Sequence, residues 1–292
     1  MPNQREFVLP GLTLAAQVWG RSGAVPVLAL HGWLDNASTF DLLAPLLPDC
    51  EIVALDLAGH GYSGFRSPDA AYNIWEDVGD LLEVAEQLGW SRFNLLGHSR
   101  GAAIAMLFAA AYPELTDRLV LLEGGVPVVG TAADAPETLA RSFRERRDLR
   151  AKSGRVFVDR STAIAERARG FTKLSTEAAE ILARRALREV DGGFRWHADQ
   201  RLKGVPEVRL TREQVRAFVE RVKAPALMIL AEESPFGGTD LYQEMIAAFD
   251  EIETVVLPGA HHLHLEGAQG EIATLVRRFL AQARRETVKK NS

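Results

Sequence analysis

One serine lies in a sequence context that favours nucleophilic chemistry. Ser99 is the centre of Gly97-His98-Ser99-Arg100-Gly101, which follows the pattern Gly-x-Ser-x-Gly. Residues 91–96 before it form a predicted strand, and an alanine-rich run up to residue 111 forms a predicted helix. A strand, a sharp turn and a helix in this order form a nucleophile elbow, whose glycines avoid collisions and leave the serine hydroxyl exposed. The first turn of the helix points its free N–H groups at any oxyanion formed there.

A serine hydroxyl is a poor nucleophile at neutral pH unless a base accepts its proton and a third group orients that base. The chain has seven histidines. Three of them follow the last predicted strand in a single loop: His261, His262 and His264. The residues alone leave the choice of base open among these three.

The other four histidines have less suitable positions. His31 and His60 lie in glycine-rich loops at the ends of predicted strands. His98 lies inside the elbow, where its side chain is expected to point away from Ser99. His197 lies in the helical middle of the chain.

Composition and charge indicate an ordinary globular protein. The 292 residues are 47% hydrophobic and 25% charged, with a net charge of −5 that provides no general attraction to nucleic acid or membrane. The single cysteine, Cys50, excludes an intrachain disulfide and suits a reducing compartment. No signal peptide or membrane-spanning stretch is visible, so we expect a cytoplasmic protein, as a monomer or homodimer, that contacts neither nucleic acid nor membrane.

Apolar strands alternate with helical segments over most of the chain, which indicates a parallel sheet with helices on both faces. The predicted strands are residues 7–9, 12–19, 25–30, 51–55, 91–96, 119–122, 226–231 and 252–257. The predicted helices outside the middle of the chain are residues 41–47, 73–88, 100–111, 241–249 and 268–284.

The middle of the chain breaks this alternation. Residues 131–221 contain no apolar strand run, and they carry 21 Lys and Arg against 14 Asp and Glu. We predict a helical cap at residues 130–222, inserted into a core formed by residues 1–129 and 223–292. The positive excess fits a solvated helix face, which is the preferred interpretation, or an attraction for an anionic substrate such as a carboxylate or an acyl-coenzyme A.

These features together resemble the α/β-hydrolases from end to end. The resemblance implies a mostly parallel eight-stranded sheet with helices on both faces and a cap inserted after the sixth strand. Three stretches resemble more narrowly the serine-hydrolase-like proteins: the run His-Gly-Trp-Leu-Asp-Asn-Ala at 31–37, the elbow, and the run Phe-Arg-Trp-His-Ala-Asp-Gln-Arg-Leu at 194–202.

The resemblance also suggests which histidine is the base. In similar proteins the base lies five residues before the Glu of a His-x-x-His-x-Glu pattern, which is His261 here. The loop is one residue shorter than the usual form, so His262 stays an alternative. His264 is expected to be a packing residue.

The acid is the unusual member of the predicted site. Most relatives carry an Asp after the seventh strand, where this chain has Ser234. Glu232 or Glu233 in the same loop is one substitute. Glu123, 24 residues after Ser99 at the end of the sixth strand, is another, and it resembles the arrangement of the haloalkane dehalogenases. We predict Glu123 as the acid, with Glu232 as the runner-up.

An oxyanion needs two N–H donors, which we assign to the backbones of Arg100 and Trp33. The Trp33 side chain is also a candidate wall of the substrate pocket. Trp196, His197, Asp199 and Arg201 are the cap residues expected to face the site. No carboxylate or cysteine has zinc-type spacing from the histidines, so we predict neither a metal ion nor another cofactor.

The sequence therefore predicts a serine hydrolase that cleaves a small-molecule carboxylic ester or thioester through an acyl-enzyme. A carbon–carbon bond hydrolase or a cofactor-free peroxidase on the same fold is an alternative. A ligand-binding relative without turnover is another, because of Ser234.

Overall fold

The computed structural model of the protein describes residues 2–170 and 172–290. Its central feature is an eight-stranded sheet in the order β1-β2-β4-β3-β5-β6-β9-β10, in which β1 and β2 pair antiparallel and the strands from β4 to β10 pair parallel. The strands of this sheet are β1 (Asn3–Leu9), β2 (Leu12–Trp19), β3 (Val25–Leu30), β4 (Cys50–Leu55), β5 (Phe93–His98), β6 (Thr116–Leu122), β9 (Ala226–Ala231) and β10 (Ile252–Leu257). The predicted mostly parallel sheet of eight strands is confirmed.

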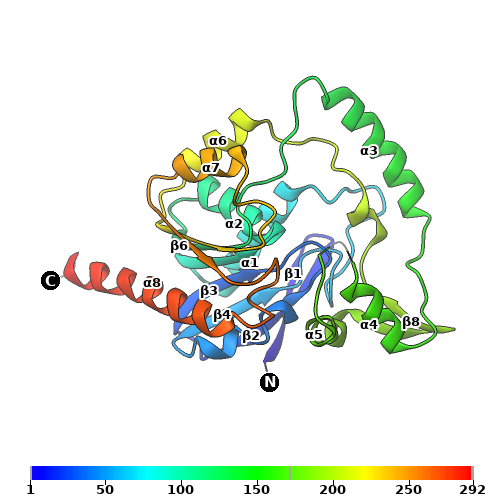
Figure 1. The fold of residues 1–292 in the computed structure, drawn as a ribbon, viewed down its shortest axis with the longest axis horizontal. Helices are drawn as coiled ribbons and strands as arrows, with labels where there is room; N and C mark the ends of the chain where they lie inside the picture. The colour runs from blue at the N-terminus through cyan, green and yellow to red at the C-terminus, as the bar shows by residue number, and fades with distance from the viewer. Residues whose placement is uncertain (1, 171, 291–292) are drawn as a thin grey trace.

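Helices cover both faces of this sheet (Figure 1). The α-helices are α1 (Ile74–Leu88), α2 (Arg100–Ala111), α3 (Ala135–Arg150), α4 (Arg160–Ala168), α5 (Thr176–Ala186), α6 (Arg212–Arg221), α7 (Asp240–Ala247) and α8 (Gln269–Lys290). The 3₁₀ turns are η1 (Ala37–Phe40), η2 (Ala44–Leu46) and η3 (Gln200–Lys203).

Apolar packing on the two faces explains the strand sequences. Every residue of β4, β5 and β9 is buried, as expected for strands covered on both sides. One core lies between the sheet and α1, α2 and α6, and the other lies between the sheet and α8. In α2 the ten residues 101–110 are all buried, which fixes the helix that follows Ser99 firmly against the sheet.

The segment between β6 and β9 contains a small hairpin besides its helices. Strands β7 (Leu187–Val190) and β8 (Gly193–Trp196) pair antiparallel, so the expectation of a wholly helical insertion is wrong for these residues. The turn between them is Asp191-Gly192, and both Gly192 and the following Gly193 have positive φ. A short polar strand with a glycine-rich turn has no apolar run to mark it, and the Asp-Gly pair is the signal that identifies it.

Figure 1 shows α3, α4, α5 and β8 gathered on one side of the sheet, away from α6 and α7. Helix α6 packs against α2, and its Val215 and Val219 are fully buried in the core shared with the sheet. The last part of the predicted segment 130–222 therefore packs with the core rather than with α3–α5. The boundaries of a separate cap stay a prediction.

The parallel strands place their carboxyl ends at one edge of the sheet, where ligands bind in open sheets of this kind. The loops after β3, β5, β6, β9 and β10 all begin there. Within the described residues, no helix has the length and apolar character that crossing a membrane requires.

Candidate active site

Ser99 lies in the turn between β5 and α2 with backbone angles φ 53° and ψ −116°. This region is sparsely populated by residues with a side chain, and such strain is found where the surrounding structure holds a functional residue in place. The Ser99 N–H donates to the Leu122 carbonyl at 2.9 Å, which ties the turn to β6. A Cβ at Gly101 would lie 2.2 Å from the Leu30 carbonyl oxygen, so only glycine lets α2 approach the sheet this closely.

His261, in the loop after β10, reaches this serine. Its Nε2 lies 3.0 Å from Ser99 Oγ, a hydrogen-bonding distance at which the hydroxyl donates to an unprotonated nitrogen. The His261 side chain is 12% exposed. A solvent-accessible edge next to the serine leaves room for a substrate above both groups.

Glu123 completes a hydrogen-bonded chain with these two residues. Its Oε2 accepts from His261 Nδ1 at 3.2 Å, and its Oε1 accepts from the Ala231 N–H at 2.6 Å. The side chain is fully buried and its φ is 47°, a second strained backbone at the same place. A Cβ at the next residue, Gly124, would lie 2.4 Å from the Ser99 carbonyl oxygen, so glycine is required for this close approach.

The alternative carboxylates lie elsewhere. Glu232 and Glu233 are both exposed in the loop after β9, and no hydrogen bond joins either carboxylate to His261. Ser234, at the position where relatives usually have an Asp, caps its own loop: its Oγ accepts from the N–H groups of Phe236 and Gly237 at 3.2 and 3.4 Å. The site therefore brings Glu123, and not Glu232, to the histidine.

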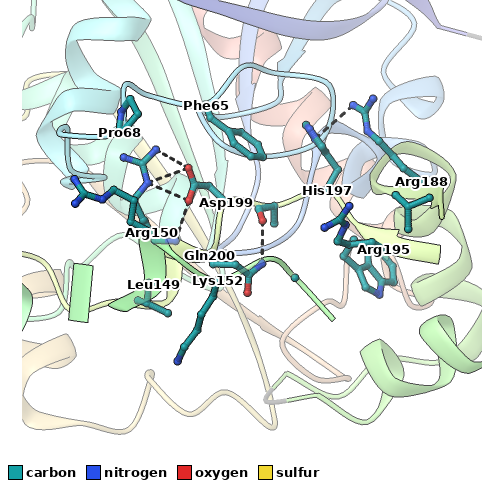
Figure 2. A pocket seen from close by; sticks show the side chains of 15 residues that line it. Phe65, Pro68, Leu149, Arg150, Lys152, Arg188, Arg195, His197, Asp199 and Gln200 are labelled. Carbon is teal, nitrogen blue, oxygen red and sulfur yellow. Dashed lines mark hydrogen bonds and ion pairs between the residues drawn. The ribbon is translucent and has the colours of Figure 1, made fainter. Parts of the chain in front are cut away.

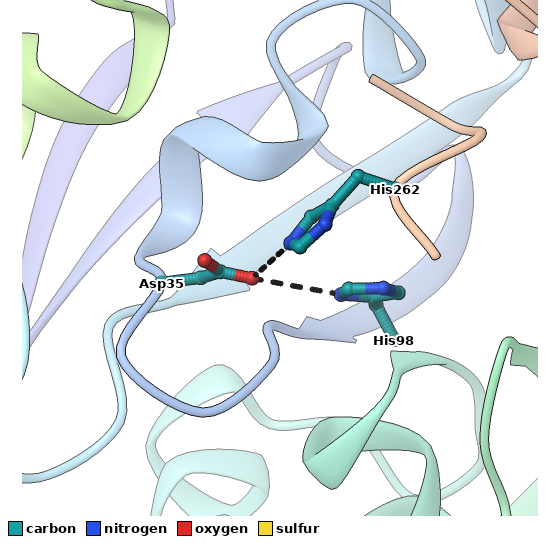
Figure 3. A group of neighbouring side chains, drawn as sticks. All are labelled: Asp35, His98 and His262. Carbon is teal, nitrogen blue, oxygen red and sulfur yellow. Dashed lines mark hydrogen bonds and ion pairs between the residues drawn. The ribbon is translucent and has the colours of Figure 1, made fainter. Parts of the chain in front are cut away.

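Asp35 and His262 form a carboxylate–histidine pair separate from that of Glu123 and His261 (Figure 3). His262 Nε2 donates to Asp35 Oδ2 at 3.0 Å, and His98 Nδ1 lies 3.7 Å from the same oxygen. All three side chains are buried. Because His262 is engaged with Asp35, it is His261 of the two neighbours that faces Ser99.

This buried group supports the loop of His261. His98 Nε2 donates to the His261 carbonyl at 2.9 Å, which directs the His98 side chain away from Ser99 as the sequence predicts. Arg167 of α4 donates to Asp35 Oδ1 at 2.7 Å. Burial alone would raise the pKa of Asp35, but His262 and Arg167 hold the pKa of this carboxyl well below its ordinary value. Asp35 and His98 therefore connect Arg167 of α4 to the backbone of His261.

Asp35, His98 and His262 each offer one possible metal ligand, and these atoms lie within 4.8 Å of one another. Asp35 is already bonded to Arg167 and to His262, whose donated proton must leave before Nε2 can bind a metal. The described contacts are those of a hydrogen-bonded ion-pair network. The absence of a metal ion stays a prediction.

The remaining buried histidines have structural contacts. His31 Nε2 accepts from the Leu57 N–H at 2.9 Å, and burial lowers the pKa of His31 to about 4. Burial likewise lowers the pKa of His60 to about 4 and that of His264 to about 3. His264 is within 2.8 Å of the Thr39 hydroxyl, in agreement with the packing role expected for it.

Two backbone N–H groups are available beside Ser99. The N–H of Arg100 belongs to the first turn of α2, where no carbonyl exists one turn earlier to accept it. No hydrogen bond engages the Trp33 N–H within the part of the chain that the structure describes. The Trp33 indole N–H donates to the Leu202 carbonyl at 2.8 Å, which fixes the ring between the sheet and η3.

Ser99 opens into a cavity of about 450 Å³. Most of its lining is apolar, and Trp33 is part of the wall as predicted. Members of the apolar lining are Ile74, Trp75, Val126, Val128, Phe236 and Tyr242. A cavity of this kind accepts an apolar group next to the serine.

The four cap residues expected at the site lie in a different cavity. An outer cavity of about 470 Å³, shown in Figure 2, is lined by Trp196, His197, Asp199 and Arg201. None of these four lines the cavity at Ser99. The hairpin β7–β8 carries the first two to that place. Sequence reasoning missed three residues of this region. Asp35, although it lies in the run 31–37, was given no role, and it binds His262. Phe236 and Arg209 line the cavity at Ser99.

Comparison with known families agrees with this fold. A family model described as alpha/beta hydrolase fold matches residues 25–268. A "Serine hydrolase-like protein" of Danio rerio is 34% identical and covers 93% of this chain and 86% of its own length. "Serine hydrolase-like protein 2" of Homo sapiens is 31% identical and covers 95% of this chain and 94% of its own length.

A solved structure is also similar over nearly the whole chain. The crystal structure of a hypothetical protein from Pseudomonas aeruginosa PAO1 has a TM-score of 0.91 at 41% identity and covers 95% of this chain and 99% of that chain. A thioesterase domain from the curacin biosynthetic pathway has a TM-score of 0.84 at 24% identity, which shows a shared fold.

Proposed function

The chain belongs to the α/β-hydrolase fold family, and its serine hydrolase-like relatives support a hydrolase function. We propose that it cleaves carboxylic esters or thioesters through an acyl-enzyme on Ser99. The observation that carries this proposal is the hydrogen-bonded chain from Ser99 Oγ through His261 to Glu123, at 3.0 and 3.2 Å. Nucleophile, base and orienting carboxylate in this order are the parts of a serine hydrolase.

In the first step His261 Nε2 takes the proton of the Ser99 hydroxyl as Oγ attacks the carbonyl carbon. The imidazole becomes positively charged, and the Glu123 carboxylate beside Nδ1 stabilises that charge and fixes the tautomer. The Ala231 N–H on the other oxygen of Glu123 keeps the carboxylate aimed at the ring. The same His261 then gives the proton to the leaving oxygen or sulfur.

The carbonyl oxygen becomes an oxyanion as the serine attacks. The N–H groups of Arg100 and Trp33 bind it, and the positive end of α2 adds to the stabilisation. After the leaving group departs, a water activated by His261 attacks the acyl carbon. The carboxylic acid is released and Ser99 regains its proton.

The cavity at Ser99 supports an apolar acyl group as part of the substrate, because Trp33, Val126 and Phe236 line it with apolar surface. Among the described residues, Glu123 is the sole carboxylate of this lining, which also contains Arg100 and Arg209, so a cationic acyl chain is disfavoured. A small-molecule acyl compound is therefore the proposed substrate.

The proposal is tested with a fluorophosphonate probe, which labels an activated serine, and with p-nitrophenyl esters and acyl thioesters as substrates. We expect labelling and turnover of the wild type, and loss of both in Ser99→Ala. Wild-type protein that neither reacts with the probe nor hydrolyses any of these compounds would contradict the proposal.

A further inference from the structure

The cavities between the sheet and the cap carry a charge distribution that the acyl site at Ser99 does not use. The outer cavity is lined by Arg150, Lys152, Arg188, Arg195 and Arg201. Its lining contains a single carboxylate, Asp199, which is already bonded to Arg201 at 2.7 Å. The positive excess of residues 131–221 is therefore concentrated in part around this cavity, in a chain whose net charge is −5.

Four of these five cations have no acidic partner among the described residues. Arg188 is one of them, and its guanidinium donates to the Gly61 carbonyl. Among the described residues, no carboxylate lies within ion-pairing distance of Arg150, Lys152 or Arg195, which extend around the cavity in Figure 2. Arg150, Lys152 and Arg188 are exposed, so solvent screens much of the repulsion between the like charges, but together they create a potential that attracts an anion. Guanidinium groups bind phosphate in a bidentate manner, and lysine adds a compact charge. The lining therefore suits a phosphorylated ligand.

The same cavity offers aromatic surface. Phe65 and His197 stack with ring centroids 4.9 Å apart and an interplanar angle of 29°. His197 Nδ1 donates to the Gly61 carbonyl at 2.6 Å, which fixes the imidazole, while Phe65 stays 43% exposed. An exposed ring beside several cations fits a nucleoside whose base stacks and whose phosphates bind the cations.

A middle cavity of about 430 Å³ shares lining residues with both the outer cavity and the cavity at Ser99. The middle and outer cavities share Arg201 as a wall. The middle cavity and the cavity at Ser99 share five residues: Trp33, Arg100, Val128, Pro206 and Arg209. Arg209 has no carboxylate partner among the described residues, so it adds an unpaired cation where the middle cavity adjoins the cavity at Ser99. The three cavities therefore adjoin one another in the order outer, middle and Ser99, and an elongated ligand would have to lie along all three.

We propose that the outer cavity binds the phosphorylated nucleoside end of an acyl thioester whose acyl group lies at Ser99. This inference rests on the proposed hydrolase function. In the reaction the Oγ–carbon bond forms and the carbon–sulfur bond breaks, and the sulfur leaves with the proton that His261 took from Ser99. Water then adds to the acyl carbon, so the products are a carboxylic acid and a thiol that keeps the phosphorylated nucleoside.

The test compares kcat/KM for octanoyl-coenzyme A, octanoyl-4′-phosphopantetheine and octanoyl-pantetheine, which share the thioester and differ in phosphate and nucleoside. We expect octanoyl-coenzyme A to exceed octanoyl-pantetheine by about 100-fold, since each charged hydrogen bond contributes about a factor of ten or more. The preference falls as ionic strength rises. Equal kcat/KM for the first and third compounds would overturn the proposal. A preference already complete with octanoyl-4′-phosphopantetheine would also overturn it, because the cavity would then recognise phosphate without a nucleoside.

Substitution of single cations tests whether the preference for octanoyl-coenzyme A arises in the outer cavity. In Arg195→Gln and in Lys152→Gln we expect the ratio of kcat/KM for octanoyl-coenzyme A to that for octanoyl-pantetheine to fall about tenfold. Arg144→Gln is the matched control, because Arg144 is an exposed cation of α3 that does not line these cavities. It should keep the wild-type ratio. The same fall in all three variants would indicate a general charge effect and would contradict a site in the outer cavity.

A binding measurement separates this inference from the proposed function. Ser99→Ala protein is titrated with adenosine 3′,5′-bisphosphate in a calorimeter, and we expect saturable binding that Arg195→Gln weakens about tenfold. Turnover of a phosphate-free ester without any binding of the bisphosphate would overturn the inference while the hydrolase proposal stands. Binding without turnover of any ester or thioester would overturn the hydrolase proposal, and with it the assignment of the bound compound as a substrate.

Discussion

Glu123 Oε2 lies 3.2 Å from His261 Nδ1, although 138 residues separate the two in the chain. Glu123 follows the end of β6, whereas the aspartate usual in similar proteins would follow β9. Because β6 and β9 are neighbours in the sheet, a carboxylate at the end of either strand starts from the same edge. The Ala231 N–H at the end of β9 donates to Glu123, so the neighbouring strand supports the carboxylate.

Replacing Glu123 with Gln should lower kcat by about 10³-fold or more, because the amide cannot stabilise a charged His261 and can favour the wrong tautomer. Hydrolysis of a p-nitrophenyl ester measures the effect. Glu232→Gln is the matched control, because the same change at an exposed carboxylate should alter kcat less than about tenfold. The opposite ranking of the two variants would assign the acid to the loop after β9.

Ser99→Ala should lower kcat on the order of 10⁴-fold or more, since it removes the nucleophile. The smaller side chain fits the strained turn, so the unfolding transition should stay close to that of the wild type. Thermal unfolding followed by circular dichroism checks this point. Wild-type turnover by the folded variant would rule out Ser99 as the nucleophile.

The two adjacent histidines should give opposite phenotypes. His261→Ala should abolish turnover with little loss of stability, because its side chain touches Ser99 and remains partly exposed. His262→Ala leaves the buried Asp35 with fewer partners and should lower the free energy of unfolding by about 3 kcal/mol. Chemical denaturation and esterase assays of both variants separate these effects. Exchanged phenotypes would make His262 the base.

The fold should lose stability as the pH falls from about 6.5 to 4. His31 and His60 have pKa values lowered to about 4 and His264 to about 3, because burial disfavours the charged ring. Between these values and the ordinary 6.5, the unfolded chain binds protons that the folded chain does not. Each histidine therefore lowers the free energy of unfolding by about 1.4 kcal/mol per pH unit as the pH falls.

Denaturant titrations at several pH values measure this dependence. His264→Gln removes one of these three imidazoles with a lowered pKa and keeps a polar group near Thr39, so the stability of the variant should depend less steeply on pH. A wild-type free energy of unfolding that does not change between pH 7 and pH 5 would contradict the prediction.

Replacement of Gly101 in the elbow and of Gly79 in α1 by alanine should change the free energy of unfolding in opposite directions. Gly101→Ala places a Cβ 2.2 Å from the Leu30 carbonyl and should lower the free energy of unfolding by about 2 kcal/mol or more. Gly79→Ala, at an exposed position inside α1 with open space around the new Cβ, should raise it by about 0.5–1 kcal/mol. Melting temperatures of the two variants provide the test, and a stable Gly101→Ala protein would contradict the tight elbow.

The sequence by itself determined the features whose cause is local. The elbow around Ser99 could be predicted because a turn this sharp requires glycines at 97 and 101 between a strand and a helix. The order of the core strands and helices could be predicted from apolar runs, because strands covered on both faces contain little else.

Only the tertiary structure decided how distant loops meet. Glu123 and Glu232 follow two neighbouring strands of the sheet. The Glu123 side chain points to His261, whereas the Glu232 side chain is exposed. Trp196 and His197 lie in the outer cavity because an unforeseen hairpin carries them there. Contacts of this kind depend on how separate elements pack, and spacing along one chain does not encode them locally.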